Sequence, residues 1–204
     1  ATFSKNPDQV SIFLMYLTFL IGAIHLSIGH ILNGIKKINS LQSLAQLGWV
    51  GVVWGLFFLV CNLILSDPLP DIALHLIWIG AIMIACFDNY LKGHFWKGIG
   101  ATIGNLPLSI ISSFGDVISY VRLFAVGLAG VAVEDSFNNM ALGGGVDNLL
   151  KGIIAILIIV FGHSLNIVLC MMSVIVHGIR LNMLEFSGHL GMQWTGQKYE
   201  PFRE

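Results

Sequence analysis

The feature that most constrains this chain is a series of long apolar stretches separated by short connectors that contain Gly, Pro, Asn and charged residues. The stretches run over residues 10–32, 43–65, 72–90, 105–141 and 148–186. A membrane-spanning helix needs about 18 to 20 apolar residues, and only 72–90 comes close to the lower limit. The chain is 56% hydrophobic and 10% charged, whereas soluble domains carry about 25% charged residues. We therefore predict an all-α integral membrane protein with about five transmembrane helices.

The last two stretches are longer than a bilayer requires. A helix of about 37 residues extends about 55 Å, against a hydrocarbon core of about 30 Å. Such helices must tilt steeply, protrude or break. Pro107, near the start of the fourth stretch, is the one proline inside the five stretches. We therefore expect the last two helices to be long and steeply tilted.

The charges outside the apolar stretches indicate the orientation. The basic residues of one face are Lys36, Lys37, Lys92, Lys97, Lys198 and Arg203, and the acidic residues of the other are Asp67, Asp71, Glu134, Asp135 and Asp147. By the positive-inside rule the carboxy-terminal tail is cytoplasmic. The amino terminus of the chain then lies on the opposite face, which requires an odd number of earlier spans if the full protein starts in the cytoplasm. We expect residues 1–204 to form a single carboxy-terminal transmembrane domain of a longer protein.

Several functional classes are disfavoured by the sequence. The net charge of −1 gives no indication of a nucleic-acid partner. Cys61, Cys86 and Cys170 lie in apolar runs without the spacing of a metal site, and His25 and His30 are interpreted as helix-packing residues. Phosphate-binding loops, dinucleotide-binding turns, serine nucleophile elbows and HExxH motifs are absent from the sequence. We predict no cofactor, no bound metal and no enzyme activity of the chain alone.

Arg122 lies deep inside the fourth stretch, where a cation costs about 2.5–3.5 kcal/mol on insertion scales. It requires a water-filled cavity, an anionic partner or a protein interior, and a structural ion pair or a snorkelling side chain is the alternative reading. Gly115, Ala125 and Ala129 share its sector of the helix. These small residues would let another helix approach closely, either near a transport site or in ordinary packing.

The fifth stretch carries a polar stripe. Its members, at steps of three and four residues, are His163, Asn166, Cys170, Ser173, His177 and Arg180. They share one helical face over about 26 Å, which is most of a hydrocarbon core. The stripe should face protein or water, either as an aqueous access path or as interhelical hydrogen bonding. Glu185 beyond the stripe and Glu134 toward the opposite face are further candidates, with solvated carboxylates as the alternative.

Two segments carry a resemblance to a known family. Residues 114–130, FGDVISYVRLFAVGLAG, resemble the penultimate membrane helix of the a/I subunit of V-type and archaeal A-type rotary ATPases. Residues 176–186, VHGIRLNMLEF, are similar to the last helix of that family, and the tail with Tyr199, Pro201 and Phe202 has the family's style. Cys170 and Gly130 replace an acid and a histidine of eukaryotic members. The resemblance is therefore to prokaryotic members, in a cell membrane.

The resemblance implies a non-catalytic stator subunit with eight membrane helices after a large cytoplasmic arm, so that the arm and about three helices precede this chain. Its two tilted helices would pack against the rotating proteolipid c/K ring, whose subunits each carry a membrane-embedded carboxylate. The peripheral and central stalk subunits and the lipid bilayer would be further partners. The sequence leaves open H⁺ or Na⁺ as the ion, and ATP synthesis or ATP-driven pumping as the direction.

Within this family pattern, Arg122 matches the essential arginine and Arg180 the second one. A nearby cation favours the ionised form of a passing ring carboxylate. An ion must then leave through one half-channel and enter through the other, which couples ion transfer to rotation. The candidate half-channel residues are Glu185, His177, Ser173, Cys170, Asn166, His163 and Glu134.

Two other functions remain as alternatives. A secondary transporter would bind its substrate near the midplane, and such folds favour internal repeats and discontinuous helices, which the sequence does not show. A purely structural membrane subunit would retain transport after disruption of the polar stripe.

Overall fold

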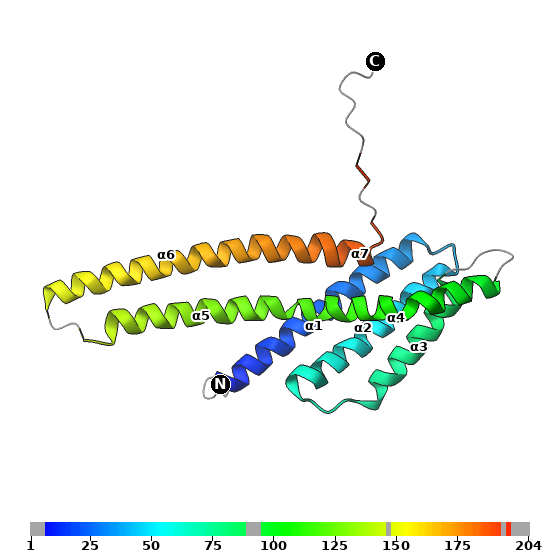
Figure 1. The fold of residues 1–204 in the computed structure, drawn as a ribbon, viewed down its shortest axis with the longest axis horizontal. Coiled ribbons are helices and arrows are strands. Elements are labelled where there is room, and N and C mark those ends of the chain that lie inside the picture. Colours follow the sequence, from blue (N-terminus) through cyan, green and yellow to red (C-terminus); the bar gives the residue numbers. More distant parts are fainter. Residues whose placement is uncertain (1–6, 89–94, 146–147, 193–194, 197–204) are drawn as a thin grey trace, which may run out of the picture.

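The computed structural model describes residues 7–88, 95–145, 148–192 and 195–196, and all its regular elements within these ranges are helices (Figure 1). They are α1 (Pro7–Lys36), α2 (Gln42–Leu65), α3 (Asp71–Phe87), α4 (Phe95–Ser119), α5 (Val121–Leu142), α6 (Leu149–Arg180), the π-helical segment η1 (Leu181–Phe186) and the short α7 (Ser187–His189). Four helical segments are long and apolar enough to cross a membrane, and the last two, Thr102–Leu142 and Leu149–His189, have 41 residues each. The predicted all-α membrane fold with two long final helices is confirmed.

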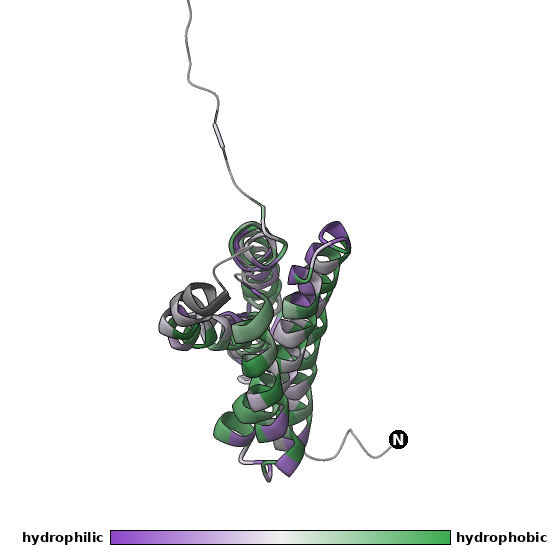
Figure 2. Cartoon of the chain, turned by 90° about the vertical axis from the view of Figure 1, so that its right-hand side faces the viewer, coloured by the Kyte–Doolittle hydropathy of each residue, from purple (hydrophilic) through white to green (hydrophobic). Residues whose placement is uncertain are grey.

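Helices α1 to α4 form a bundle with an apolar core. Its buried side chains include Phe19 and Leu26 of α1, Phe57 of α2 and Val117 of α4, and Tyr120 and Leu181 from outside these helices join them. Hydrophilic residues gather toward the ends of the bundle, whereas apolar residues cover most of its length (Figure 2). The bundle therefore has the surface that a bilayer requires, apolar in the middle and polar at its ends.

Helices α2 and α3 approach each other through glycines. A Cβ atom on Gly80 would lie 2.6 Å from the Gly48 carbonyl oxygen, and one on Gly55 would lie 2.5 Å from Ile77 Cγ1. Backbone atoms of the two helices are thus in direct contact. This is the small-residue packing that membrane helices use in place of a hydrophobic driving force.

Helices α5 and α6 form a long hairpin that extends well beyond the bundle, at an oblique angle to α1, α2 and α3 (Figure 1). Within α5, all of which the structure describes, no residue is fully buried, and within α6 only Ala155 and Gly162 are. Segments of 41 residues would be about 60 Å long, twice a hydrocarbon core, so a bilayer can enclose them only at a steep tilt.

The structure differs from the sequence prediction at the start and middle of the fourth stretch. Helix α4 begins at Phe95, ten residues before the predicted 105, because the glycine-containing segment read as a connector is helical. Pro107 consequently lies inside α4 rather than near its start. The predicted continuous helix is also interrupted at Tyr120, between α4 and α5.

The glycine contacts lead to a stability prediction. Gly80→Ala in the full-length protein places a methyl group against the Gly48 carbonyl, so the two helices must separate. Overpacking of this kind costs about 1–3 kcal/mol. The thermal unfolding midpoint of the detergent-purified protein should fall accordingly. Gly51→Ala is the matched control, because its Cβ would lie 3.6 Å from the Leu76 carbonyl oxygen, and an equal midpoint for both variants would contradict the packing described.

Candidate functional site

Both candidate arginines lie beside interruptions of regular α-helix. The Leu123 amide donates to the Tyr120 carbonyl at 3.0 Å and the Tyr120 amide to the Val117 carbonyl at 3.4 Å, so the helix tightens just before Arg122. Arg180 is the last residue of α6 and directly precedes η1. Single π-helical turns are frequent at functional sites, and tightened turns inside helices mark hinges or strained segments. The sequence predicted neither interruption.

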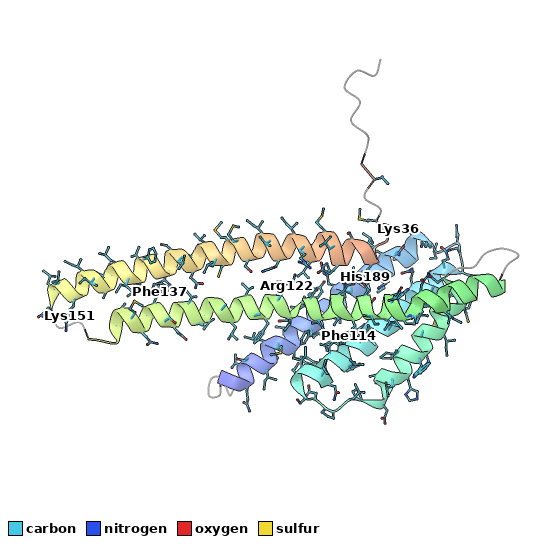
Figure 3. The ribbon with its side chains drawn as sticks, viewed as in Figure 1. Lys36, Phe114, Arg122, Phe137, Lys151 and His189 are labelled. Carbon is cyan, nitrogen blue, oxygen red and sulfur yellow. The ribbon has the colours of Figure 1, made fainter. Side chains whose placement is uncertain are left out.

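Arg122 carries a charge that the described part of the chain does not neutralise. Its side chain is half-buried and lies between α5 and α6 (Figure 3). Its Nη1 atom is enclosed and has no hydrogen-bond partner among the described residues, and no ion pair with a described carboxylate is present. Because an unpaired cation in an apolar setting is costly, the site is incomplete without an anion or water from outside these residues.

The polar stripe of α6 turns partly toward α5. His163, Asn166, Ser173 and His177 are half-buried on a helix that is otherwise largely exposed. The contact is close at Gly130, whose Cβ would lie 3.2 Å from Asn166 Oδ1 and 3.6 Å from Cys170 Sγ. The stripe thus follows the line along which α5 and α6 meet.

The two ends of the stripe differ. At one end the Cys170 thiol donates to Asn166 Oδ1 at 3.7 Å, a local contact within the helix. Toward the other end His177 Nδ1 is enclosed without a described partner, and Arg180 is 56% exposed. Interhelical hydrogen bonding therefore does not account for His177.

The remaining predicted residues lie on the hairpin and along α4. Glu134 is half-buried on α5, twelve residues beyond Arg122. Gly115, Ala125 and Ala129 are exposed, and a Cβ on Gly115 would meet no described atom within 4 Å. Among the described helices, none packs closely on these small residues.

A polar cavity of about 520 Å³ opens near the end of the bundle at which Lys36 lies, close to His189 (Figure 3). It lies between α1, α2, α4 and the turn from α6 to α7. Its lining residues are His30, Asn33, Gln46, Trp49, Ser109, Ser112, Ser113, Asp116, Arg180, Leu184, Glu185, Gly188 and His189. Among the predicted residues, the structure brings Arg180 and Glu185 together here, and it places Arg122 and the rest of the stripe outside the lining.

Glu185 is the buried acid of this cavity. Its side chain is 6% exposed, and its Oε1 atom lies 3.9 Å from Arg180 Nε across the π-helical segment. Its Oε2 atom has no hydrogen-bond partner among the described residues. A carboxylate oxygen left open in a polar cavity is suited to accept a proton, a cation or water.

Two hydrogen bonds shape the wall of the cavity. His189 Nε2 and Asp116 Oδ2 are 2.9 Å apart, which joins α7 to α4. His30 Nδ1 and Gln46 Oε1 are also 2.9 Å apart, and His30 Nε2 has no described partner. With Glu185 Oε2, this gives two buried polar atoms at the cavity that no described residue satisfies, and water is the usual partner of such atoms.

Sequence reasoning missed most of the cavity residues, although a signal for them exists. Buried Ser27, His30 and Asn33 recur at steps of three on α1. Ser109, Ser112 and Asp116 recur at steps of three and four on α4. The helical-spacing test that identified the α6 stripe would have found both sets.

Metal binding has no support in the described residues, which contain no group of three His, Cys, Asp or Glu placed to hold an ion. No protein-family model and no solved structure matches the chain.

Curated proteins, in contrast, match along nearly the whole chain. The V-type ATP synthase subunit I of Borreliella burgdorferi is 41% identical over 98% of this chain and 34% of its own length. The V-type ATP synthase subunit I 1 of Treponema pallidum is 38% identical over 98% of this chain and 32% of its own length. The A-type ATP synthase subunit I of Methanocaldococcus jannaschii is 27% identical over 98% of this chain and 28% of its own length.

The chain therefore spans about a third of the length of these relatives. The similarity extends over all of its helices, including the first three, for which the sequence motifs gave no resemblance. By this similarity, the chain belongs to the subunit I family of V-type and A-type ATP synthases and corresponds to a membrane segment of that subunit.

Proposed function

We propose that this chain is the ion-translocating membrane part of a rotary ATPase stator, in which Arg122 separates two half-channels and couples H⁺ or Na⁺ movement to rotation of a proteolipid ring. The observation that carries the proposal is the uncompensated Arg122 guanidinium on a long, largely exposed helical hairpin. A ring carboxylate that passes this charge would be held ionised. It would take up a proton or cation again only after moving away from Arg122.

The cavity is the proposed half-channel on the Lys36 side. It is polar and contains the buried Glu185 carboxylate, with its Oε1 atom 3.9 Å from Arg180 Nε. The open Glu185 Oε2 and His30 Nε2 atoms favour a water-filled path over a packed interior. Because Lys36 lies at this end and Lys37 follows it in the chain, the positive-inside rule assigns this half-channel to the cytoplasmic side.

The second half-channel would approach Arg122 from the opposite face along the seam between α5 and α6. Glu134 lies about 18 Å from Arg122 along α5, at 1.5 Å per residue. The half-buried stripe residues of α6 provide polar groups along the same seam, and His177 Nδ1 lacks a described partner. The exposed Gly115, Ala125 and Ala129 leave room for ring helices to approach Arg122.

The other parts of the proposed complex are inferred from the names of the relatives, which are ATP synthase subunits. The longer protein would contribute an amino-terminal cytoplasmic arm and earlier membrane helices, and residues 1–204 its single carboxy-terminal membrane domain. Peripheral and central stalk subunits would connect it to the nucleotide-binding part. The setting would be a prokaryotic cell membrane, with the carboxy terminus in the cytoplasm.

The central prediction concerns Arg122. In the full-length protein, assembled with its native partners, Arg122→Ala should reduce ATP-driven ion uptake into vesicles to background, because ring carboxylates lose the charge that holds them ionised. Subunit composition on native gels should not change. Lys36→Ala, an exposed cation at the end of α1, is the matched control and should transport normally. Normal uptake by Arg122→Ala complexes would refute the proposal.

The cytoplasmic half-channel predicts selective thiol labelling. With Cys61, Cys86 and Cys170 replaced by alanine, Ser109→Cys should react with a membrane-impermeant maleimide added from the Lys36 side, because Ser109 lines the cavity. Leu108→Cys should not react, because Leu108 is 69% exposed on the outer surface of the same helix and is absent from the cavity lining, so it would face lipid. Mass spectrometry of the labelled peptides measures both. Equal labelling of the two positions would show that the cavity is not an aqueous path.

A further inference from the structure

The two interruptions beside the arginines are connected through one side chain of α1. His25 Nδ1 lies 2.7 Å from the Tyr120 hydroxyl oxygen. Its ring also stacks on Phe186, with ring centroids 4.4 Å apart and an interplanar angle of 4°. Tyr120 is the residue between α4 and α5, and Phe186 is the last residue of η1. His25 therefore contacts both irregular segments at once.

The position of Tyr120 depends on α1. A Cβ on Gly22 would lie 2.7 Å from Tyr120 Cγ, so the tyrosine ring lies directly on the α1 backbone, and Tyr120 is 2% exposed. Phe186 approaches the next turn of α1, where a Cβ on Gly29 would lie 3.4 Å from Phe186 Cε2. Gly22, His25 and Gly29 thus form one face of α1 that receives both aromatic rings.

We propose that His25 is a positioning residue, which sets the relative placement of Arg122 and Arg180 through Tyr120 and Phe186. Arg122 follows Tyr120 by two residues, and Arg180 directly precedes η1. An interruption can bend a helix, so side chains that contact it from a neighbouring helix help to set the direction of the helix beyond it. The inference rests on the proposed function for its consequence, since the two arginines act on transport only if that function is correct.

The bond that acts is specific to one imidazole nitrogen. An asparagine at position 25 can place its side-chain amide group where His25 Nδ1 lies. A glutamine is one methylene longer and places its amide group where His25 Nε2 lies. His25→Asn therefore keeps a hydrogen-bonding atom near the Tyr120 hydroxyl, and His25→Gln moves it away. If His25 only filled space, His25→Asn and His25→Gln would have similar effects. The variant His25→Phe keeps an aromatic ring to stack on Phe186 but cannot form the hydrogen bond, so it separates the effect of stacking from that of hydrogen bonding.

The test uses the assembled complex with the full-length protein and measures ion uptake per ATP hydrolysed. We expect His25→Gln and His25→Phe to lower this ratio about tenfold, the size of change that loss of one buried hydrogen bond produces in a conformational equilibrium. His25→Asn should stay within about twofold of the unmodified complex by the same reasoning. Tyr120→Phe should match His25→Gln, and combining Tyr120→Phe with His25→Gln should cause no further loss.

Equal ratios for His25→Asn and His25→Gln, or a normal ratio for Tyr120→Phe, would overturn the positioning role. Arg122→Ala, measured alongside, separates this failure from failure of the proposed function. If Arg122→Ala abolishes uptake while the His25 variants are normal, only the positioning inference fails. If Arg122→Ala complexes transport normally, both the proposed function and the positioning inference fail.

Discussion

The arrangement depends on one unfavourable charge, the Arg122 guanidinium in an apolar hairpin. A cation in this setting is tolerated only where something outside the hairpin stabilises it, and the described residues supply no carboxylate for it. Helices α5 and α6, both described in full, are also largely exposed, with Ala155 and Gly162 as the only fully buried residues of the two. The open charge favours the proposed contact with a second protein surface, whereas lipid alone could cover the apolar side chains of the hairpin.

The bundle of α1 to α4 supplies the buried core that the hairpin lacks. Glycine contacts hold α2 and α3 backbone to backbone, and the core beneath them includes Tyr120, at the root of the hairpin. The cavity lies where the bundle meets the carboxy-terminal end of the hairpin's second helix, at η1 and α7. The cavity is therefore built jointly by the bundle and by the end of the hairpin, whereas Arg122 lies outside it.

The sequence predicted what depends on local pattern and missed what depends on long-range contact. Apolar length predicted the spans, and helical spacing predicted the α6 stripe, because both are properties of single helices. The cavity was not predicted, since its wall requires pairs such as Asp116 with His189, 73 residues apart. The interruption at Tyr120 was missed for the same reason, because its contact with His25 spans 95 residues. The start of α4 was predicted ten residues too late because the glycine-containing segment before residue 105 was read as a connector.

The most direct measurement is a cryo-electron microscopy structure of the full-length protein with its native partners, with attention to the surroundings of Arg122. The account predicts that helices of small, apolar subunits cover the exposed hairpin, and that one of their membrane-embedded carboxylates lies at the level of the guanidinium. It also predicts water in the cavity beside Glu185. Lipid over the hairpin, with Arg122 paired to an acid of its own chain, would contradict the account.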